Sequence, residues 1–193
     1  MTHPSIAATP EHTPVIQICV TGPECTGKTT LAQRLATHFH AEFVPEAARL
    51  YAERINRELR SGDVEFIAAE HIAMADDAAR RVIDRGGGIL VLDQDLVSTA
   101  VYGKDYYNFA SDWLTSESRR RRADLYLLCD VDVPWVSDGI RDRPIDRDAM
   151  LALFAGALSD LDVTFARIHG SWEERWQRAL AACHSVIDAQ TTP

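Results

Sequence analysis

The sequence predicts an α/β fold in which a parallel sheet carries helices on both faces. Short apolar runs rich in β-branched residues alternate with helical patterns along the 193 residues, an order typical of parallel sheets with right-handed connections. The first apolar run, residues 15–20, leads into Gly-Pro-Glu-Cys-Thr-Gly-Lys-Thr at 22–29, and a helical pattern follows. A strand, this glycine-lysine-threonine spacing and a helix together indicate a P-loop NTPase. The loop then lies at the carboxyl edge of the sheet, where ligands bind in such folds.

The later elements follow from local patterns. Two apolar runs, residues 89–92 and 125–129, have no polar alternation, which is typical of parallel strands buried on both faces. Ser171 and Glu174 have the spacing of a capping box, so we expect a helix to begin there. The other expected elements are a strand at 42–44, a helix over 46–60 broken by Ser61-Gly62-Asp63, helices over 64–85, 97–102, 111–121 and 148–161, and a strand at 164–168.

Composition favours one soluble domain with a small-molecule partner. The hydrophobic fraction is 46%, the charged fraction 25% and the net charge −9, and a main partner of DNA or RNA usually requires a basic protein. No apolar stretch is long enough to cross a bilayer, and the four cysteines lack C-x-x-C spacing. We therefore expect a cytoplasmic protein without nucleic-acid or membrane partners, with a flexible tail at 1–14 and a single domain at 15–193.

The P-loop predicts a binding site for the phosphates of ATP. Its backbone N–H groups and the positive end of the following helix attract an anion, and glycines at 22 and 27 allow close backbone approach. Lys28 is expected to reach the β- and γ-phosphates, and the Thr29 hydroxyl to join the shell of Mg2+. The expected nucleotide-binding residues are Gly22, Glu24, Cys25, Thr26, Gly27, Lys28, Thr29 and Thr30.

The strand at 89–92 ends in Asp93, as a Walker B strand does. Its carboxylate is expected beside the P-loop, as a ligand of Mg2+. Asp95 follows two residues later and has two possible roles. It is either the catalytic base or anchor for an acceptor hydroxyl, or the N-cap of the next helix.

Two further segments are candidates for catalysis and acceptor binding. Arg141, Arg143 and Arg147 lie between a buried strand and a helix, where they are either a lid that stabilises the transferring phosphoryl group or a solvated charged loop. Such a lid would make the fold similar to the nucleoside and nucleotide kinases. Glu46 and Arg49 follow the strand at 42–44 and either bind the acceptor or form an ordinary i,i+3 surface pair.

These segments, in this order, resemble the NadR-type ribosylnicotinamide kinases, a P-loop AAA-like family. The matching stretches are GPECTGKTTL, VPEAARLYAE, VLDQDLVSTAVYG, ADLYLLCDVDVPWVSDGIRDRP and IHGSWEERWQRA. The resemblance implies transfer of the ATP γ-phosphoryl to the 5′-hydroxyl of nicotinamide riboside. It assigns Lys28 and Thr29 to phosphate and Mg2+, Asp93 and Asp95 to metal and acceptor, and Arg141 and Arg143 to the lid. Trp135, in the fourth stretch, is a further substrate-binding candidate.

The chain departs from the family at the acceptor ring. Ala47 and Met74 stand where family members carry aromatic residues. The residues that could replace them are Tyr51, Tyr102, Tyr106, Tyr107 and Trp135. The resemblance extends to the kinase half only, so we expect a stand-alone kinase. Two alternatives stay open: a kinase of another nucleoside or nucleotide, and an NTP-binding switch with slow hydrolysis.

Overall fold

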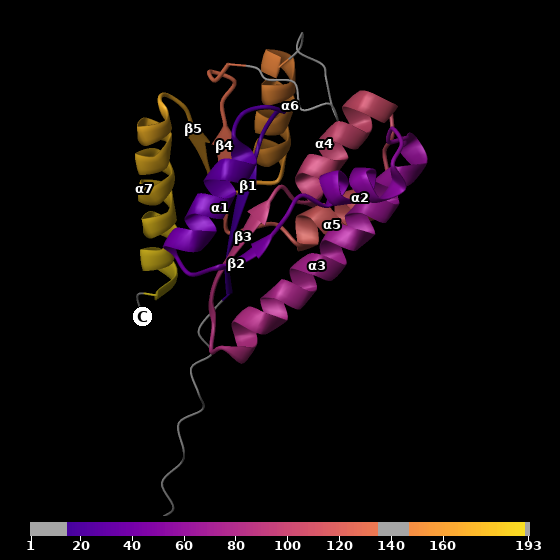
Figure 1. Cartoon of the computed structure of the whole chain (residues 1–193). Helices are drawn as coiled ribbons and strands as arrows, with labels where there is room; N and C mark the ends of the chain where they lie inside the picture. The colour runs from indigo at the N-terminus through magenta and orange to yellow at the C-terminus, as the bar shows by residue number, and fades with distance from the viewer. Residues whose placement is uncertain (1–14, 135–146, 192–193) are drawn as a thin grey trace, which may run out of the picture.

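The computed structural model describes residues 15–134 and 147–191, and within them it confirms the expected α/β fold. Five strands of these residues form one parallel sheet in the order β2-β3-β1-β4-β5 (Figure 1). The strands are β1 (Val15–Thr21), β2 (Glu42–Val44), β3 (Gly88–Asp93), β4 (Leu125–Cys129) and β5 (Phe165–Ile168). The helices are α1 (Lys28–His38), α2 (Ala47–Ile55), α3 (Val64–Asp84), α4 (Leu96–Tyr107), α5 (Asp112–Arg120), α6 (Arg147–Asp160) and α7 (Trp172–Thr191), with a short 3-10 turn at Ser61–Asp63.

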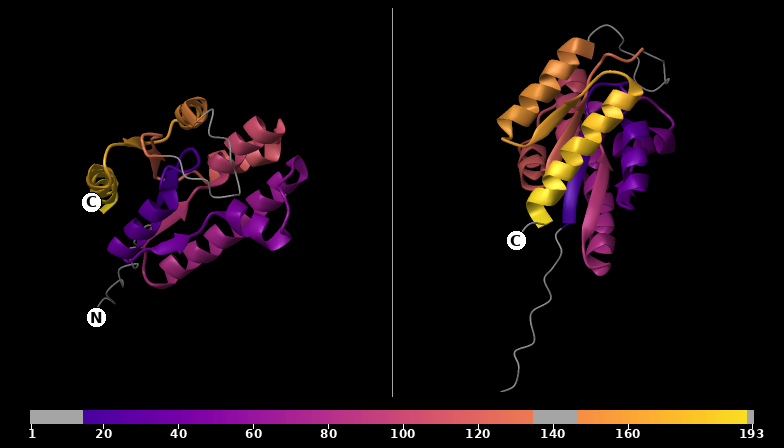
Figure 2. Two further views of the ribbon diagram at one scale, coloured as in Figure 1. Left: turned by 45° about the horizontal axis from the view of Figure 1, so that its top comes forward. Right: turned by 90° about the vertical axis from the view of Figure 1, so that its left-hand side faces the viewer.

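Strand β1 lies at the centre of the sheet, and helices cover both faces (Figures 1 and 2). Ile18 is aligned with Val91 of β3 on one side and with Leu125 of β4 on the other. Helices α1 and α7 pack on one face, whereas α3, α4 and α6 pack on the other. This arrangement brings the carboxyl ends of β1, β2 and β3 to one edge, where the glycine loop begins.

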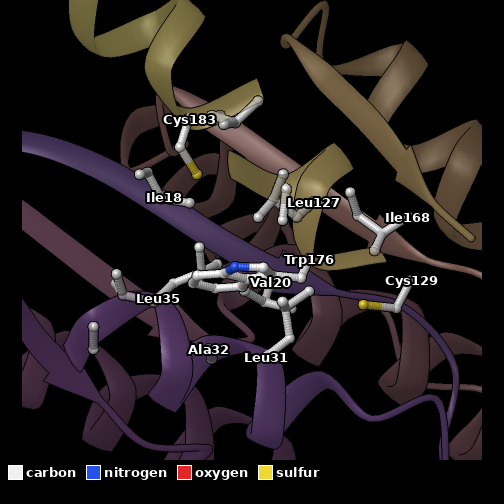
Figure 3. Close-up of a cluster of buried hydrophobic side chains, with 14 of the residues drawn as sticks. Ile18, Val20, Leu31, Ala32, Leu35, Leu127, Cys129, Ile168, Trp176 and Cys183 are labelled. Atoms are coloured by element: carbon white, nitrogen blue, oxygen red, sulfur yellow. The ribbon is translucent and has the colours of Figure 1, made fainter. Parts of the chain in front are cut away.

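The core beneath the glycine loop is apolar. Alternate residues of β1 pack on the α1 and α7 face, because successive side chains of a strand point to opposite faces. Figure 3 shows this cluster, in which α7 contributes Trp176 and Cys183, β1 contributes Ile18 and Val20, and α1 contributes Leu31 and Leu35. The burial holds the first turn of α1, and with it the loop, against the end of the sheet.

The helix expected over 46–60 is shorter than predicted. Helix α2 ends at Ile55, because Asn56 adopts a left-handed conformation with φ 50° and its N–H bonds to the carbonyl oxygen of Ala52. An asparagine at this position is a common way to end a helix. Helix α4, in contrast, runs beyond the expected 97–102 to Tyr107 and ends at Asn108 in the same manner. The extension places Tyr106 and Tyr107 on α4.

Hydrogen bonds confirm the local pattern expected at the start of the last helix. The Ser171 hydroxyl accepts a hydrogen bond from the N–H of Glu174 at 3.4 Å, and the Glu174 carboxylate accepts one from the N–H of Ser171 at 2.8 Å. This is the capping box predicted for the last helix.

All four cysteines are free thiols, as expected from their spacing. Over residues 15–134 and 147–191, the helices are too short or too polar to cross a bilayer.

Candidate active site

The glycine loop has the backbone geometry that a phosphate-binding loop requires. Gly22 has φ 129°, and a Cβ atom there would lie 2.7 Å from the carbonyl oxygen of Cys129. Gly27 has φ 78° and is the N-cap of α1. Cys25, between them, adopts a left-handed φ of 53°. The loop therefore folds tightly against the end of β4, and its two glycines are needed for contact as well as for conformation.

Lys28 and Thr29 begin α1 and point to different partners. Lys28 is buried, and its ammonium group donates to the carbonyl oxygen of Pro23 at 2.5 Å, within the loop. The Thr29 hydroxyl donates to Oδ2 of Asp93 at 2.7 Å. The P-loop and the end of β3 are thus joined by a direct side-chain contact, as the Walker A and Walker B interpretation requires.

Asp93 has one oxygen free to bind a cation. Its Oδ1 atom is buried and has no hydrogen-bond partner among the residues that the structure describes. Burial raises the pKa of this carboxyl above its ordinary value, and the nearby charge of Glu46 raises it further, while the bond from Thr29 lowers it. A buried carboxylate oxygen without a donor is a suitable ligand for a hard cation. Thr29 and Asp93 therefore fit Mg2+.

Glu46 reaches the same edge of the sheet from β2. Val44 pairs with Leu92, so the residues that follow the two strands emerge side by side. Glu46 is buried, and its carboxylate lies 3.8 Å from the guanidinium of Arg49, one turn along α2. The i,i+3 pair left open by the sequence is thus present. Glu46 also lines a pocket together with Asp93, which is consistent with acceptor binding.

Asp95 caps helix α4. Its Oδ1 accepts hydrogen bonds from the N–H groups of Val97 at 3.0 Å and Ser98 at 3.3 Å, and its Oδ2 accepts one from the Tyr126 hydroxyl at 2.6 Å. Burial raises the pKa of this carboxyl, against the effect of these bonds. Of the two roles considered for Asp95, the structure shows the cap. Because both oxygens already have donors, Asp95 is poorly placed to accept a proton from a substrate.

The pocket beside these carboxylates lies between α2, α3 and α4. Its lining is mostly apolar and aromatic, with the carboxylates grouped at the sheet edge. The free volume is about 40 Å³, far below the several hundred Å³ typical of small-molecule sites, so the bound state needs a wider opening. The lining residues are Glu46, Ala47, Ala48, Leu59, Val64, Ile67, His71, Asp93, Gln94, Asp95, Thr99, Tyr102, Gly103, Tyr106 and Tyr107.

Two tyrosines of α4 connect this pocket to the glycine loop. The Tyr102 hydroxyl donates to the carbonyl oxygen of Gly22 at 3.2 Å, and the Tyr106 hydroxyl donates to the carboxylate of Glu24. Among the aromatic candidates named from the sequence, Tyr102, Tyr106 and Tyr107 thus line the pocket. Tyr51 does not, because its hydroxyl donates to Asp63 at 3.2 Å.

The chain belongs to a known family. A family model described as an AAA domain matches residues 17–175. The chain is a member of this AAA-domain family. It is 25% identical over 176 residues to the trifunctional NAD biosynthesis/regulator protein NadR of Escherichia coli K12, a match that covers 88% of this chain and 41% of that protein. The resemblance to NadR noted from the sequence is thereby confirmed.

Comparison with solved structures also shows that this AAA-domain protein is similar to NadR. A crystal structure of NadR in complex with NR has a TM-score of 0.71 at 25% identity, covering 91% of this chain and 52% of that one. A NadR structure with NAD and AMP-PNP has a TM-score of 0.68 at 25% identity, covering 91% and 50%. Thymidylate kinase from Candida albicans shares the fold, with a TM-score of 0.62 at 15% identity and coverage of 91% and 92%. The chain spans about half the length of the NadR proteins it matches, and the similarities support a P-loop kinase.

The AAA-domain chain carries two arginines at the glycine loop, one of which sequence reasoning did not single out. Arg175 is 1% exposed and donates to the carbonyl oxygens of Thr26 at 3.1 Å and Asp130 at 2.9 Å. Arg147 donates to the carbonyl oxygen of Cys25 at 3.3 Å, and its buried Nε has no partner within the described parts of the chain. Arg147 was noted with the lid arginines, whereas nothing in the spacing around Arg175 predicts its contacts.

The remaining expected site residues have mixed placements. Thr26 is buried and its hydroxyl donates to the carbonyl oxygen of Pro23 at 2.9 Å, while Thr30 is exposed on α1. Arg141, Arg143 and Trp135 lie outside the described residues, as does the tail at 1–14.

Proposed function

We propose that this protein is a kinase that transfers the γ-phosphoryl group of ATP to the hydroxyl of a nucleoside, most specifically the 5′-hydroxyl of nicotinamide riboside. One observation carries the proposal. Thr29 at the start of α1 is bonded to Asp93 at the end of β3, and Asp93 in turn lines the pocket that contains Glu46. The proposed phosphate site and the proposed acceptor pocket therefore adjoin at one carboxylate, an arrangement that supports direct transfer.

The residues of the glycine loop bind and orient the phosphates. Lys28 exchanges its contact with the Pro23 carbonyl for the phosphate oxygens, a stronger, charge-assisted interaction. Arg147 lies above the loop through its bond to Cys25 and adds positive charge where the transferred group develops negative charge. Arg141 and Arg143 belong to the same proposal as lid residues.

The carboxylates at the sheet edge have separate tasks. Thr29 and Asp93 hold Mg2+, which when bound neutralises phosphate charge and orients the γ-phosphate. Glu46 accepts the proton of the acceptor hydroxyl as that oxygen bonds to the γ-phosphorus and the bond from phosphorus to the bridging oxygen breaks, leaving ADP. Arg49 pairs with the Glu46 carboxylate, and Asp95 positions α4 through its cap.

The acceptor assignment rests on the similarity to NadR and on the pocket lining. The relative crystallised with NR has about a quarter of its residues in common with this chain over the aligned part. Tyr102, Tyr106 and Tyr107 supply aromatic surface where Ala47 and Met74 do not. The carboxylates of Glu46 and Asp93 favour a cationic ring such as a pyridinium. We further propose that the activity is cytoplasmic, in keeping with the four free thiols.

The test is ADP release from Mg-ATP with a panel of acceptors and a control without acceptor. The panel contains nicotinamide riboside, nicotinic acid riboside and the common nucleosides and nucleoside monophosphates. Stimulation by nicotinamide riboside, with the mononucleotide as product, supports the proposal. Stimulation by another nucleoside alone would move the acceptor assignment but keep the kinase. Slow hydrolysis without stimulation would favour an NTP-binding switch instead.

A further inference from the structure

His71 is a buried polar residue of the pocket that the mechanism above does not use. It lies in the middle of α3, is 5% exposed, and lines the pocket together with Val64 and Ile67. These three residues share one face of the helix, since they stand at positions i, i+3 and i+7. In residues 15–134 and 147–191, no hydrogen bond involves the imidazole of His71, in contrast to the buried Asp63 and Asp95 nearby. The ring nitrogens are not among the fully buried atoms without a partner in these residues, so they keep slight exposure.

The lack of a hydrogen-bond partner for the His71 imidazole, at the wall of a pocket, needs an explanation. A donor and an acceptor that have no partner and little access to water reduce the stability of a protein. Native proteins keep few groups of this kind, and those that remain are commonly completed by a ligand or an ordered water. Because His71 faces a pocket rather than the sealed core, a ligand that enters the pocket can complete it.

The ring is neutral at physiological pH. Burial, together with the charge of Arg121, lowers the pKa of His71 to about 4, against the opposing charge of Asp76. A neutral imidazole presents one N–H donor and one nitrogen acceptor. It therefore suits a neutral group that both accepts and donates, such as a carboxamide, and cannot supply positive charge to a carboxylate. The carboxylates of Glu46 and Asp93 in the same pocket also disfavour an anionic substituent.

We propose that His71 is a specificity-determining residue, which hydrogen-bonds the neutral polar substituent of the acceptor ring and selects an amide-bearing nucleoside over its carboxylate analogue. This inference rests on the proposed kinase function and extends it to the choice of acceptor. Val64 and Ile67 provide apolar surface for the ring on the same helix face. The phosphate end of the reaction is independent of His71, since no part of the glycine loop lies on α3.

The experiment compares wild type, His71→Met and His71→Gln with three acceptors: nicotinamide riboside, nicotinic acid riboside and the riboside of unsubstituted pyridine. Methionine keeps the side-chain volume but offers no comparable hydrogen bond, whereas glutamine keeps a donor and an acceptor. We expect wild type to prefer the amide. We expect His71→Met to lower kcat/KM for the amide by about 10- to 100-fold, mainly through KM, with little change for the unsubstituted ring. His71→Gln should recover part of the loss, and KM for ATP should not change.

Ile72→Val is the matched control, because Ile72 is adjacent on α3 and packs in the core rather than lining the pocket. Thermal unfolding of each variant checks that the fold is retained. Equal losses with all three acceptors, or an unchanged amide preference in His71→Met, would overturn this inference alone. If wild type binds ATP but phosphorylates no acceptor of the panel, the proposed function and this inference are both overturned. If another nucleoside is the substrate, the same comparison is made with that nucleoside and its analogue without the exocyclic polar group, and the same outcomes decide.

Discussion

The hydroxyl of Thr29 donates a 2.7 Å hydrogen bond to Oδ2 of Asp93, and this bond joins residues 64 positions apart in the chain. The two side chains come from neighbouring elements, α1 after the central strand β1 and the end of β3. The other oxygen of Asp93 is buried without a partner in the described residues. This pair therefore connects the glycine loop to the pocket that we propose for the acceptor.

Replacing the carboxylate of this pair should disable metal-dependent turnover. Asp93→Asn keeps the size of the side chain and can still accept the Thr29 bond, but it removes the charge that favours a cation. We expect kcat to fall by about 100-fold or more and the Mg2+ concentration for half-maximal rate to rise. Steady-state kinetics over a Mg2+ series measure both quantities. Asp112→Asn, at an exposed position of α5, is the control. A kinetic profile identical to wild type would rule out Asp93 as the metal ligand.

A substitution at Asp95 separates the two roles that the sequence left open. Asp95→Asn keeps an oxygen for the N–H groups of Val97 and Ser98 but disturbs the bond from Tyr126. We expect a loss of about 1–3 kcal/mol in the free energy of unfolding, with kcat within about tenfold of wild type. Urea unfolding and steady-state kinetics on the same preparation test this. A loss of turnover above a thousandfold in a stably folded variant would instead establish Asp95 as the base.

Arg175 should affect both stability and nucleotide affinity. Its guanidinium holds the carbonyl oxygens of Thr26, Asp130 and Gly170 and pairs with Asp132. Arg175→Lys keeps the charge but cannot reach these partners at once, because lysine lacks the planar fork. We expect a loss of about 2–4 kcal/mol in unfolding free energy and about tenfold weaker ATP binding, measured by calorimetry. Arg178→Lys serves as the control, because Arg178 is also an arginine of α7 but is exposed. Equal ATP affinity in both variants would show that Arg175 does not support the loop.

Asp63 makes part of the stability dependent on pH. Hydrogen bonds from the Arg57 guanidinium, the Arg60 N–H and the Tyr51 hydroxyl hold the pKa of Asp63 at about 2, against an ordinary 3.8. A lowered pKa in the folded state stabilises the protein above the ordinary value, and this contribution disappears as pH falls toward 2. We expect Asp63→Asn to cost about 1–2 kcal/mol at pH 7, and the difference from wild type to shrink below pH 4. Denaturant unfolding from pH 7 to pH 3 measures this; a difference that stays constant would contradict it.

Much of the fold follows from local patterns. The two continuous apolar runs became the buried strands β3 and β4, and the capping box at Ser171 and Glu174 begins α7 as expected. These features depend on residues close in sequence, so their spacing alone specifies them. The ends of α2 and α4 were less predictable, because both helices stop where an asparagine takes a left-handed conformation that the sequence permits but does not require.

The sequence by itself determined the glycine-loop half of the candidate site. Its motif can be recognised residue by residue. The motif consists of a strand, the glycine loop with Lys28 and Thr29, and a second strand that ends in Asp93. Only the tertiary structure decided the pocket that we propose for the acceptor. Asp95 has donors on both oxygens because Tyr126, on another strand, bonds to the oxygen that does not cap α4, and His71 lines the pocket because α3 packs beside α4. Such roles depend on which distant elements meet, and this is set by the packing of helices on the sheet rather than by spacing along the chain.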